Sequence, residues 1–346
     1  MSMTMKALMK TTPELTELKN IPIPQYGAKE VLVRVRSAAL CGTDLHVYNW
    51  NHWAQGAGIQ LPVVMGHECC GDVVAVGSGV KGIKAGDKVV VETHIPCGEC
   101  YQCQNGEQHI CNHLKMFSIH TNGGFAEYTV MPAECTRKIP HEISYDVGAL
   151  LEPIGTALRA VETNRVGGRN VVVVGCGPIG LFAVAAAAAL GAAKILAIDI
   201  SAYRLTVAEK VGADIVINTT EEDSVQTVLA STGGYGADVV IEASGSVEGI
   251  KQSFKFLRKG GRVALIGLPD QPVEFDLVRD IVFKEAKITG IHGREMFKTW
   301  TQMENLLVSG KLVVEPVITH VLPLAQWQEG IDLAKKGQAC KVIYRP

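Results

Sequence analysis

The chain has 346 residues, which is enough for two domains at the usual ~100 to 200 residues each. Hydrophobic residues make up 47% of it and charged residues 20%, an ordinary globular composition that excludes disordered, collagen-like and coiled-coil chains. Lysine and arginine total 33 and aspartate and glutamate 35, so the formal charge of −2 gives no basic field, and nucleic acid is not an expected partner.

The first residues, 1–14, lack the apolar core and cleavage site of a secretory signal, which predicts a cytoplasmic protein without disulfides. One uncharged stretch, 171–193, has the length of a membrane span. Three glycines and a proline interrupt its first half, and the second half is mostly alanine. A buried strand, a tight turn and a helix explain this stretch, so we expect no membrane partner.

The N-terminal part of the chain is expected to consist of short strands. Apolar runs at 31–35, 70–76, 88–91 and 126–130 are separated by glycine and proline turns. This pattern is typical of a barrel-like β domain.

Candidate ligands for a catalytic metal are scattered through this region. Cys41, His67, Glu68 and Glu152 offer a thiolate, an imidazole and two carboxylates, and three such ligands plus an exchangeable position form a catalytic zinc site. Each residue is a weak indication by itself, because a lone cysteine is more often a core residue and a lone histidine or glutamate is usually hydrogen-bonded or solvated. The hypothesis of a catalytic metal therefore depends on the assembly.

Four further cysteines are closely spaced. Cys97, Cys100, Cys103 and Cys111 form the pattern C-x2-C-x2-C-x7-C in a loop that contains glycine and asparagine. Four thiolates around one tetrahedral ion indicate zinc, and such a closed site has no position for substrate, so its role is structural. An iron–sulfur cluster is the alternative, but the fourth cysteine is not followed by proline and the spacing is not that of the common ferredoxins.

A nucleotide-binding turn is expected at 175–180. A strand at 171–174 precedes the sequence Gly-Cys-Gly-Pro-Ile-Gly, and an alanine-rich helix follows to about residue 190. This is G-x-G-x-x-G in its strand-to-helix context, where the glycines and the helix N-terminus accommodate a pyrophosphate. The residues of the motif are Gly175, Gly177, Pro178, Ile179 and Gly180.

The next strand, 194–199, ends in an acid that predicts the coenzyme. The Asp199 carboxylate can accept hydrogen bonds from ribose hydroxyls and would repel a 2′-phosphate, which favours NAD over NADP. Arg204 complicates this, because an arginine here can bind a phosphate or stack on adenine. Asp199 could also merely cap the following helix.

Alternating strands and helices continue to the C-terminal part of the chain. Strands at 214–217, 238–242, 262–266 and 287–290 predict an α/β fold with a doubly wound parallel Rossmann sheet. The tail, with strands at 318–321 and 341–344, is expected to return to the first domain. We therefore predict a Rossmann domain at 156–294 and a catalytic zinc-binding domain formed by 1–155 and 295–346.

The assembled motifs resemble the zinc-containing medium-chain dehydrogenases over nearly the full length. The zinc signature G-H-E-x2-G-x5-G-x2-V of that family is met by Gly66, His67, Glu68, Gly71, Gly77 and Val80, and the other motifs follow in the order of the family. The resemblance implies a GroES-like, β-barrel-type catalytic domain beside the Rossmann domain, and two zinc ions per chain, one catalytic and one structural.

The resemblance also implies roles for single residues. Cys41, His67 and Glu68 would be ligands of the catalytic zinc, Glu152 an alternate ligand or relay group, and Thr43 and His46 the proton relay. The coenzyme would lie against Ile179, Asp199, Arg204, Ile266, Gly267, Leu268, Ile291 and His292. Whether Glu68 or Glu152 binds the catalytic zinc in the resting state stays open, as does the possibility that Cys69 or Cys70 competes as a ligand.

Within this family, the stretches 41–46, 50–55, 92–95 and 290–294 resemble members that oxidise the C3 hydroxyl of L-threonine to 2-amino-3-ketobutyrate with NAD. His94 and Arg294 would then contact the charged groups of the substrate, with Trp50 as a wall. Each has a simpler interpretation, because tryptophans are mostly core or interface residues and an arginine can bind coenzyme. The resemblance further implies a homotetramer.

Two other functions remain open. The first is oxidation of polyols or vicinal diols, such as sorbitol or 2,3-butanediol, on the same scaffold. The second is a non-catalytic nucleotide-binding zinc protein, which would hold one zinc ion per chain where the enzyme holds two.

Overall fold

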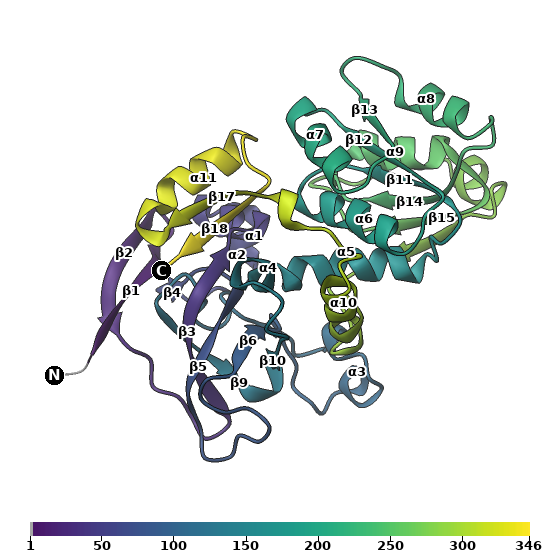
Figure 1. Ribbon diagram of the computed structural model, residues 1–346. Coiled ribbons are helices and arrows are strands. Elements are labelled where there is room, and N and C mark those ends of the chain that lie inside the picture. Colours follow the sequence, from purple (N-terminus) through teal and green to yellow (C-terminus); the bar gives the residue numbers. More distant parts are fainter. Residues whose placement is uncertain (1–2) are drawn as a thin grey trace. The chain divides into compact units, whose positions relative to one another are not determined.

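The structure is a computed structural model that describes residues 3–346, and it divides into two compact units (Figure 1). Unit 1 contains the chain up to Glu152 together with Ile318–Pro346, and unit 2 is Pro153–Val317. The predicted return of the tail to the first part of the chain is thus present, but it begins at 318 and not at 295. Residues 295–317 group with unit 2, where buried Arg294 packs against Gly155 and lies 5.6 Å from the centre of the Trp300 ring.

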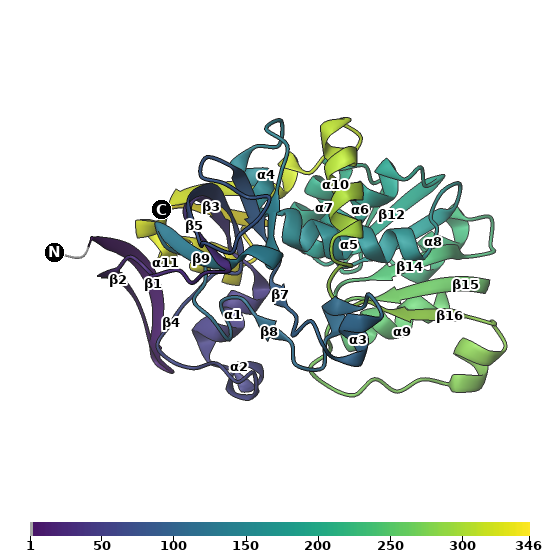
Figure 2. The ribbon, with the colours of Figure 1, turned by 90° about the horizontal axis from the view of Figure 1, so that it is seen from below.

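Unit 2 is built on a six-stranded, fully parallel sheet with the strand order β13-β12-β11-β14-β15-β16. This is the expected doubly wound Rossmann sheet. Figure 2 shows β14, β15 and β16 side by side at one end of it. The strands are β11 (Asn170–Val174), β12 (Lys194–Asp199), β13 (Ile215–Asn218), β14 (Ala237–Glu242), β15 (Leu257–Leu265) and β16 (Lys287–Gly290).

Helices cover both faces of this sheet. Residues of α8 and α9 form one core with Val172, Val174 and Leu196, whereas α6 begins against Val173 on the other face. The central strand β11 contains four consecutive valines, all buried, as expected where both faces are covered. The helices are α5 (Leu151–Thr163), α6 (Pro178–Ala189), α7 (Ala202–Lys210), α8 (Ser224–Ser231), α9 (Val247–Lys255) and α10 (Lys298–Val308), with the short turns η3 (Leu277–Val282) and η4 (Glu315–Val317).

The apolar stretch 171–193 is β11, the turn and α6, as predicted. Eight consecutive residues of α6, Gly180 to Ala187, are buried, which explains why this helix is apolar on all sides. Among the described residues, no helix is both long and apolar enough to cross a bilayer.

Unit 1 consists of mostly antiparallel β-structure with short helices, and its last two strands pair in parallel. A seven-stranded sheet has the order β10-β6-β5-β3-β18-β17, with β9 paired to β3, and a three-stranded sheet has the order β2-β1-β4. The strands are β1 (Thr4–Thr12), β2 (Leu15–Pro22), β3 (Glu30–Ala39), β4 (Val63–Val64), β5 (Glu68–Val76), β6 (Lys88–Val91), β7 (His94–Ile95), β8 (Lys115–Met116), β9 (Tyr128–Pro132), β10 (Thr136–Lys138), β17 (Ile318–Pro323) and β18 (Lys341–Arg345). Strands β1 and β2 were not among the predicted elements.

The helices of unit 1 are short and lie in the connections. They are α1 (Gly42–Asn49), α2 (His52–Gly56), α3 (Tyr101–Gln104), α4 (Tyr145–Ala149) and α11 (Trp327–Lys335), with the 3-10 turns η1 (Gln108–Ile110), η2 (Ala133–Cys135) and η5 (Leu324–Gln326). The C-terminal strand β18 pairs antiparallel with β3 through Ile343 and Ala39. The core of unit 1 therefore contains residues from both ends of the chain, such as Leu8 and Tyr344.

Candidate functional site

Cys41, His67 and Glu68 come together in unit 1. Cys41 follows β3 and is the N-cap of α1, and His67 and Glu68 lie at the start of β5, which pairs with β3 so that Ala39 faces Glu68. One ligand atom from each of the three lies within 4.8 Å of the others. A thiolate, an imidazole and a carboxylate in this arrangement fit a catalytic zinc ion with an exchangeable fourth position.

Asp44 supports this cluster from α1. Its Oδ2 accepts a hydrogen bond from the Cys41 backbone N–H at 2.9 Å, and its Oδ1 lies 3.7 Å from His67 Nδ1. Nδ1 of His67 thus faces a carboxylate, which leaves Nε2 for the metal, as in other carboxylate–histidine–zinc sites. Burial disfavours the charged ring, but Cys41 and Asp44 outweigh it and hold the pKa of His67 well above its ordinary value.

A buried lysine faces the third member of the cluster. Lys341 in β18 donates to both carboxylate oxygens of Glu68, and both side chains are almost completely buried. Burial raises the pKa of Glu68, and the Lys341 ammonium opposes this shift. Neither Lys341 nor Asp44 was among the predicted site residues.

Glu152 lies close to the cluster but is not among the three converging ligands. Its Oε1 accepts a hydrogen bond from Thr93 Oγ1 at 3.1 Å, and the same hydroxyl lies 3.5 Å from the His67 carbonyl oxygen. The geometry thus favours Glu68 over Glu152 as the third ligand in this conformation. Thr93 is a further contact that the sequence motifs did not indicate.

The four clustered cysteines converge as well. The Cys97, Cys100, Cys103 and Cys111 sulfur atoms lie within 4.8 Å of one another, and three Sγ–Sγ distances are 3.5, 3.6 and 3.7 Å. Thiolates about 2.3 Å from a tetrahedral zinc ion would be separated by roughly 3.8 Å, so the loop fits zinc. Backbone N–H groups of Cys103 and Asn112 lower the pKa of Cys100 to about 6, which favours the thiolate that binds metal.

Cys69 and Cys70 do not join either cluster. Cys69 Sγ packs beside Gly124 and Cys70 Sγ beside Gly148. Burial raises the pKa of Cys69 to about 12 and that of Cys70 further, which keeps both as neutral thiols. They are core residues and not competing ligands.

The predicted proton-relay residues lie on α1. Thr43 Oγ1 is 3.9 Å from Cys41 Sγ. His46, one turn further along the helix, has an exposed side chain, and its Nδ1 lies 2.6 Å from the side-chain amide nitrogen of Asn51. The helix therefore leads from the metal cluster to the surface.

The turn 175–180 in unit 2 has the geometry of a pyrophosphate site. Gly175 has φ +89°, a left-handed value that favours glycine. A Cβ at Gly180 would overlap the Gly175 carbonyl oxygen, whereas a Cβ at Gly177 would meet no atom within 4 Å. The first glycine makes the turn, the third allows close packing of α6, and the second leaves space beside the backbone, the roles that these positions have in dinucleotide sites. Pro178 and Ile179 form the first turn of α6.

Asp199 lies beside this turn at the end of β12. Its Oδ2 accepts from the Cys176 backbone N–H at 2.6 Å and its Oδ1 from the Ser201 N–H at 2.8 Å. A carboxylate has about four acceptor positions, so two remain for ribose hydroxyls. Arg204 lies in the first turn of α7, which Ser201 and not Asp199 caps.

The other predicted coenzyme residues follow the carboxyl ends of neighbouring strands. Ile266, Gly267 and Leu268 come after β15, and Ile291 and His292 after β16. The Ile266 and Gly267 N–H groups donate to the Glu242 carbonyl oxygen at the end of β14. All of them thus lie at the sheet edge where open α/β sheets bind ligands.

The residues predicted to contact substrate differ from one another in their burial and in their contacts. His94 in β7 is buried, and its Nδ1 lies 2.9 Å from Glu92 Oε1. Trp50 ends α1 in a left-handed conformation with φ 48°. Arg294 is fully buried in unit 2 against Trp300 and Gly155, which favours a structural role.

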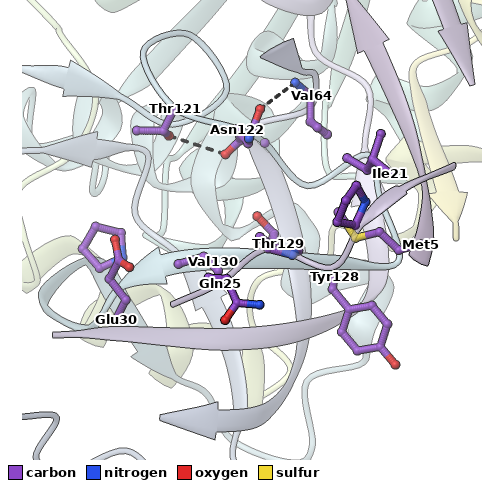
Figure 3. Close-up of a pocket in the computed structure, with 14 residues that line it drawn as sticks. Met5, Ile21, Gln25, Glu30, Val64, Thr121, Asn122, Tyr128, Thr129 and Val130 are labelled. Carbon is purple, nitrogen blue, oxygen red and sulfur yellow. Dashed lines mark hydrogen bonds between the residues drawn. The ribbon is translucent and has the colours of Figure 1, made fainter. Parts of the chain in front are cut away.

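A separate cavity of about 350 Å³ lies elsewhere in unit 1, near β1 and β9 (Figure 3). Glu30 is the one charged residue among those that line it, and its Oε2 accepts from the Gly27 N–H at 2.6 Å. Asn122 in its wall accepts from the Val64 N–H at 3.0 Å. The lining contains none of the predicted zinc, relay or coenzyme residues.

Comparisons with known proteins agree with this arrangement. Residues 27–141 match the alcohol dehydrogenase GroES-like domain and 178–309 the zinc-binding dehydrogenase domain. The chain is 45% identical over 343 residues to an L-threonine 3-dehydrogenase of Bacillus licheniformis, covering 99% of each chain. Its fold is similar to a zinc-binding dehydrogenase of Sinorhizobium meliloti bound to NADP (TM-score 0.92, 30% identity, 100% of both chains) and to 2R,3R-butanediol dehydrogenase of Bacillus subtilis (TM-score 0.90, 29% identity, 99% of both chains).

Proposed function

The chain belongs to the zinc-binding dehydrogenases, and within this family we propose that it is an NAD-dependent L-threonine 3-dehydrogenase. The observation that carries the proposal is the 45% identity with a threonine dehydrogenase over 99% of both chains. The convergence of Cys41, His67 and Glu68 supports a catalytic zinc ion, and the four-cysteine cluster supports a structural one.

The chemistry is the oxidation of a secondary alcohol. Zinc held by Cys41, His67 and Glu68 supplies a Lewis acid that lowers the pKa of the substrate hydroxyl, and NAD supplies the hydride acceptor. Thr43 Oγ1 takes the hydroxyl proton and passes it toward His46, whose exposed ring exchanges protons with water. Loss of that proton and of a hydride from C3 converts L-threonine into 2-amino-3-ketobutyrate.

NAD would be held at the carboxyl ends of the parallel strands in unit 2. The backbone at Gly177 would accommodate the pyrophosphate, and Asp199 would accept hydrogen bonds from the ribose hydroxyls. Arg204, Ile266, Gly267, Leu268, Ile291 and His292 complete this site. Asp199 would repel a 2′-phosphate, so NAD is the coenzyme here although the relative from Sinorhizobium meliloti binds NADP.

Recognition of the amino acid requires partners for its ammonium and carboxylate groups. His94, held by Glu92, is the candidate in unit 1, and Trp50 is a candidate wall. Arg294 remains a candidate from sequence only, because its burial and its contact with Trp300 also suit a purely structural role.

The test is a panel of alcohols with NAD. L-Threonine should give the highest kcat/KM, and L-serine should retain detectable turnover because a missing methyl group costs only ~1 to 3 kcal/mol. Sorbitol and 2,3-butanediol lack the charged groups and leave their buried partners unpaired, which is a larger loss. If either of them outperforms threonine, the diol dehydrogenase alternative, which has a structural relative at 29% identity, replaces this proposal.

We also propose a cytoplasmic homotetramer. Five of the ten cysteines lie in the two proposed zinc clusters, and zinc binding needs reduced thiolates, which suits a reducing compartment. Strand β16 ends its sheet, and near it Leu277, Val282, Phe283 and Ile288 are exposed, which supports contact with a second copy. Light scattering on the purified protein measures the mass of the assembly.

A further inference from the structure

Asn51 connects α1 to α2 and is held by four hydrogen bonds. Its backbone N–H donates to the His46 carbonyl oxygen at 3.3 Å, and its carbonyl oxygen accepts from the Gln55 N–H at 3.0 Å. Its side chain caps α2, with Oδ1 accepting from the Ala54 N–H at 3.2 Å, and its Nδ2 lies 2.6 Å from His46 Nδ1. The conformation of Asn51 is therefore fixed from both sides.

These contacts determine which atom of the amide faces His46. The Ala54 N–H can only donate, so the cap position must hold the amide oxygen. The amide nitrogen, which can only donate, then faces His46 Nδ1, and Nδ1 must accept. A neutral imidazole with an accepting Nδ1 carries its hydrogen on Nε2.

We propose that Asn51 is a positioning residue that holds neutral His46 as the Nε2–H tautomer. The proposal rests on the relay role given to His46 above. The tilted contact between the His46 and Trp53 rings, with centroids 5.8 Å apart, helps to fix the ring plane.

This tautomer has a consequence for the path of the proton. The lone pair of neutral His46 lies on Nδ1, so a proton that reaches the ring forms an N–H bond there and displaces the Asn51 amide. The proton on Nε2 is then the one released to water. The Asn51 amide N–H cannot face an N–H on His46 Nδ1, so Asn51 favours return of the ring to the Nε2–H tautomer.

Two substitutions separate this role from helix capping. Asn51→Ser and Asn51→Asp both keep a good N-cap residue, so α2 should persist and the melting temperatures should stay close to that of the wild type. Serine is too short to reach His46. Aspartate places an accepting oxygen opposite Nδ1 and therefore favours the Nδ1–H tautomer.

The experiment is nitrogen-15 NMR on the zinc-loaded protein labelled at histidine and asparagine, with His46→Gln to assign the signals. In the wild type we expect protonated Nε2, unprotonated Nδ1 and a scalar coupling between Asn51 Nδ2 and His46 Nδ1. The coupling should vanish in Asn51→Ser, and the tautomer should invert in Asn51→Asp. A wild-type ring protonated on Nδ1 at high pH, or the absence of the coupling, would overturn the proposal.

Turnover provides the second readout. In Asn51→Asp the lone pair of the neutral ring lies on Nε2, so Nδ1, the atom that takes the proton in the wild type, can no longer accept it. We therefore expect kcat for L-threonine to fall by about tenfold or more, with NADH binding unchanged. An unchanged kcat together with an inverted tautomer would refute the proton path. The NMR result does not depend on substrate, so failure of the wild type to oxidise threonine would count against the proposed function alone.

Discussion

Lys341 and Glu68 form a buried ion pair although 273 residues separate them in the chain: Lys341 Nζ lies 2.7 Å from Glu68 Oε1 and 2.5 Å from Oε2. Glu68 is itself a proposed metal ligand, and the surrounding protein excludes water from both groups of the pair. Replacement of one partner therefore leaves an uncompensated buried charge.

We expect Lys341→Met to lower the free energy of unfolding by ~3 to 5 kcal/mol and the zinc affinity by about 10- to 100-fold, because the carboxylate loses its partner. Urea unfolding and competition with a zinc chelator measure the two effects. The double variant Lys341→Met/Glu68→Gln removes both charges and should recover most of the stability. Equal instability of the double variant would show that packing, and not charge, is responsible.

Two glycines of the nucleotide turn should respond differently to alanine. A Cβ at Gly180 overlaps the Gly175 carbonyl oxygen, so Gly180→Ala should destabilise unit 2. Gly177→Ala meets no atom of the protein and should melt like the wild type. Because the pyrophosphate must approach the backbone at Gly177, the same variant should bind NADH at least tenfold more weakly, by about 1.4 kcal/mol. Unchanged NADH affinity in Gly177→Ala would place the pyrophosphate elsewhere.

The two cysteine clusters should separate activity from stability. Cys41→Ser should abolish turnover and release one zinc ion. The protein should stay folded, because His67 still faces Asp44 and Glu68 still pairs with Lys341. Cys100→Ser should lower the melting temperature, because a closed four-cysteine site contributes folding free energy. Metal analysis and calorimetry on both variants test this assignment. Loss of turnover in Cys100→Ser at an unchanged melting temperature would contradict it.

Coenzyme preference should depend on Asp199. The wild type should use NAD at least tenfold more efficiently than NADP, because one charge repulsion in a partly buried site exceeds ~1.4 kcal/mol. Asp199→Ala should raise the efficiency with NADP and lower that with NAD. Steady-state kinetics with both coenzymes are the measurement, and equal use by the wild type would indicate that Arg204 binds the phosphate.

Acid should destabilise unit 1 through Asp72. Burial favours its neutral form, but hydrogen bonds from the Tyr145 hydroxyl at 2.6 Å and from Arg36 at 2.7 Å outweigh it and lower the pKa of Asp72. The unfolded chain therefore binds the proton first, with a pKa of ~3.9, so this stabilisation is complete above that value and is lost as the pH falls through the folded pKa.

The expected difference in unfolding free energy between the wild type and Asp72→Asn is about 1 kcal/mol at pH 7, shrinking as the pH falls below ~4. Urea unfolding at several pH values measures it. Tyr145→Phe is the matched control, since it removes one of the two donors and should lose part of the same pH-dependent difference. A difference that stays constant down to pH 3 would refute the role of Asp72.

Much of the fold follows from local patterns. One continuous motif contains the four valines of β11, the glycine turn and the acid that ends β12. This strand–turn–helix–strand motif has a known geometry, so its structure could be predicted. The strands β1 and β2 carry mixed polar residues, and β2 has no buried residue, which removes the apolar signal. Residues 295–317 belong to unit 2 through tertiary packing, such as the contact between Trp300 and Arg294, and no local sequence pattern indicates such a contact.

The same distinction applies to the site. Cys41, His67 and Glu68 lie in recognisable motifs, and the structure brings them together. Asp44 lies in the motif 41–46, but its bond to the Cys41 N–H becomes visible only when α1 is formed. Lys341 is a single lysine in a short strand, and its partner is known only from the pairing of β18 with β3, which is why sequence reasoning missed it.

The position of β18 inside the sheet of unit 1 has a consequence for biosynthesis. All of unit 2 is synthesised before residues 341–345, so its parallel sheet can form first, whereas the sheet of unit 1 lacks an inner strand until the very end of translation. A nascent chain that stops short of Lys341 leaves Glu68 without its countercharge and β3 without its neighbour. Truncated products would thus be inactive and exposed to proteolysis, so that only a fully translated chain acquires the proposed activity.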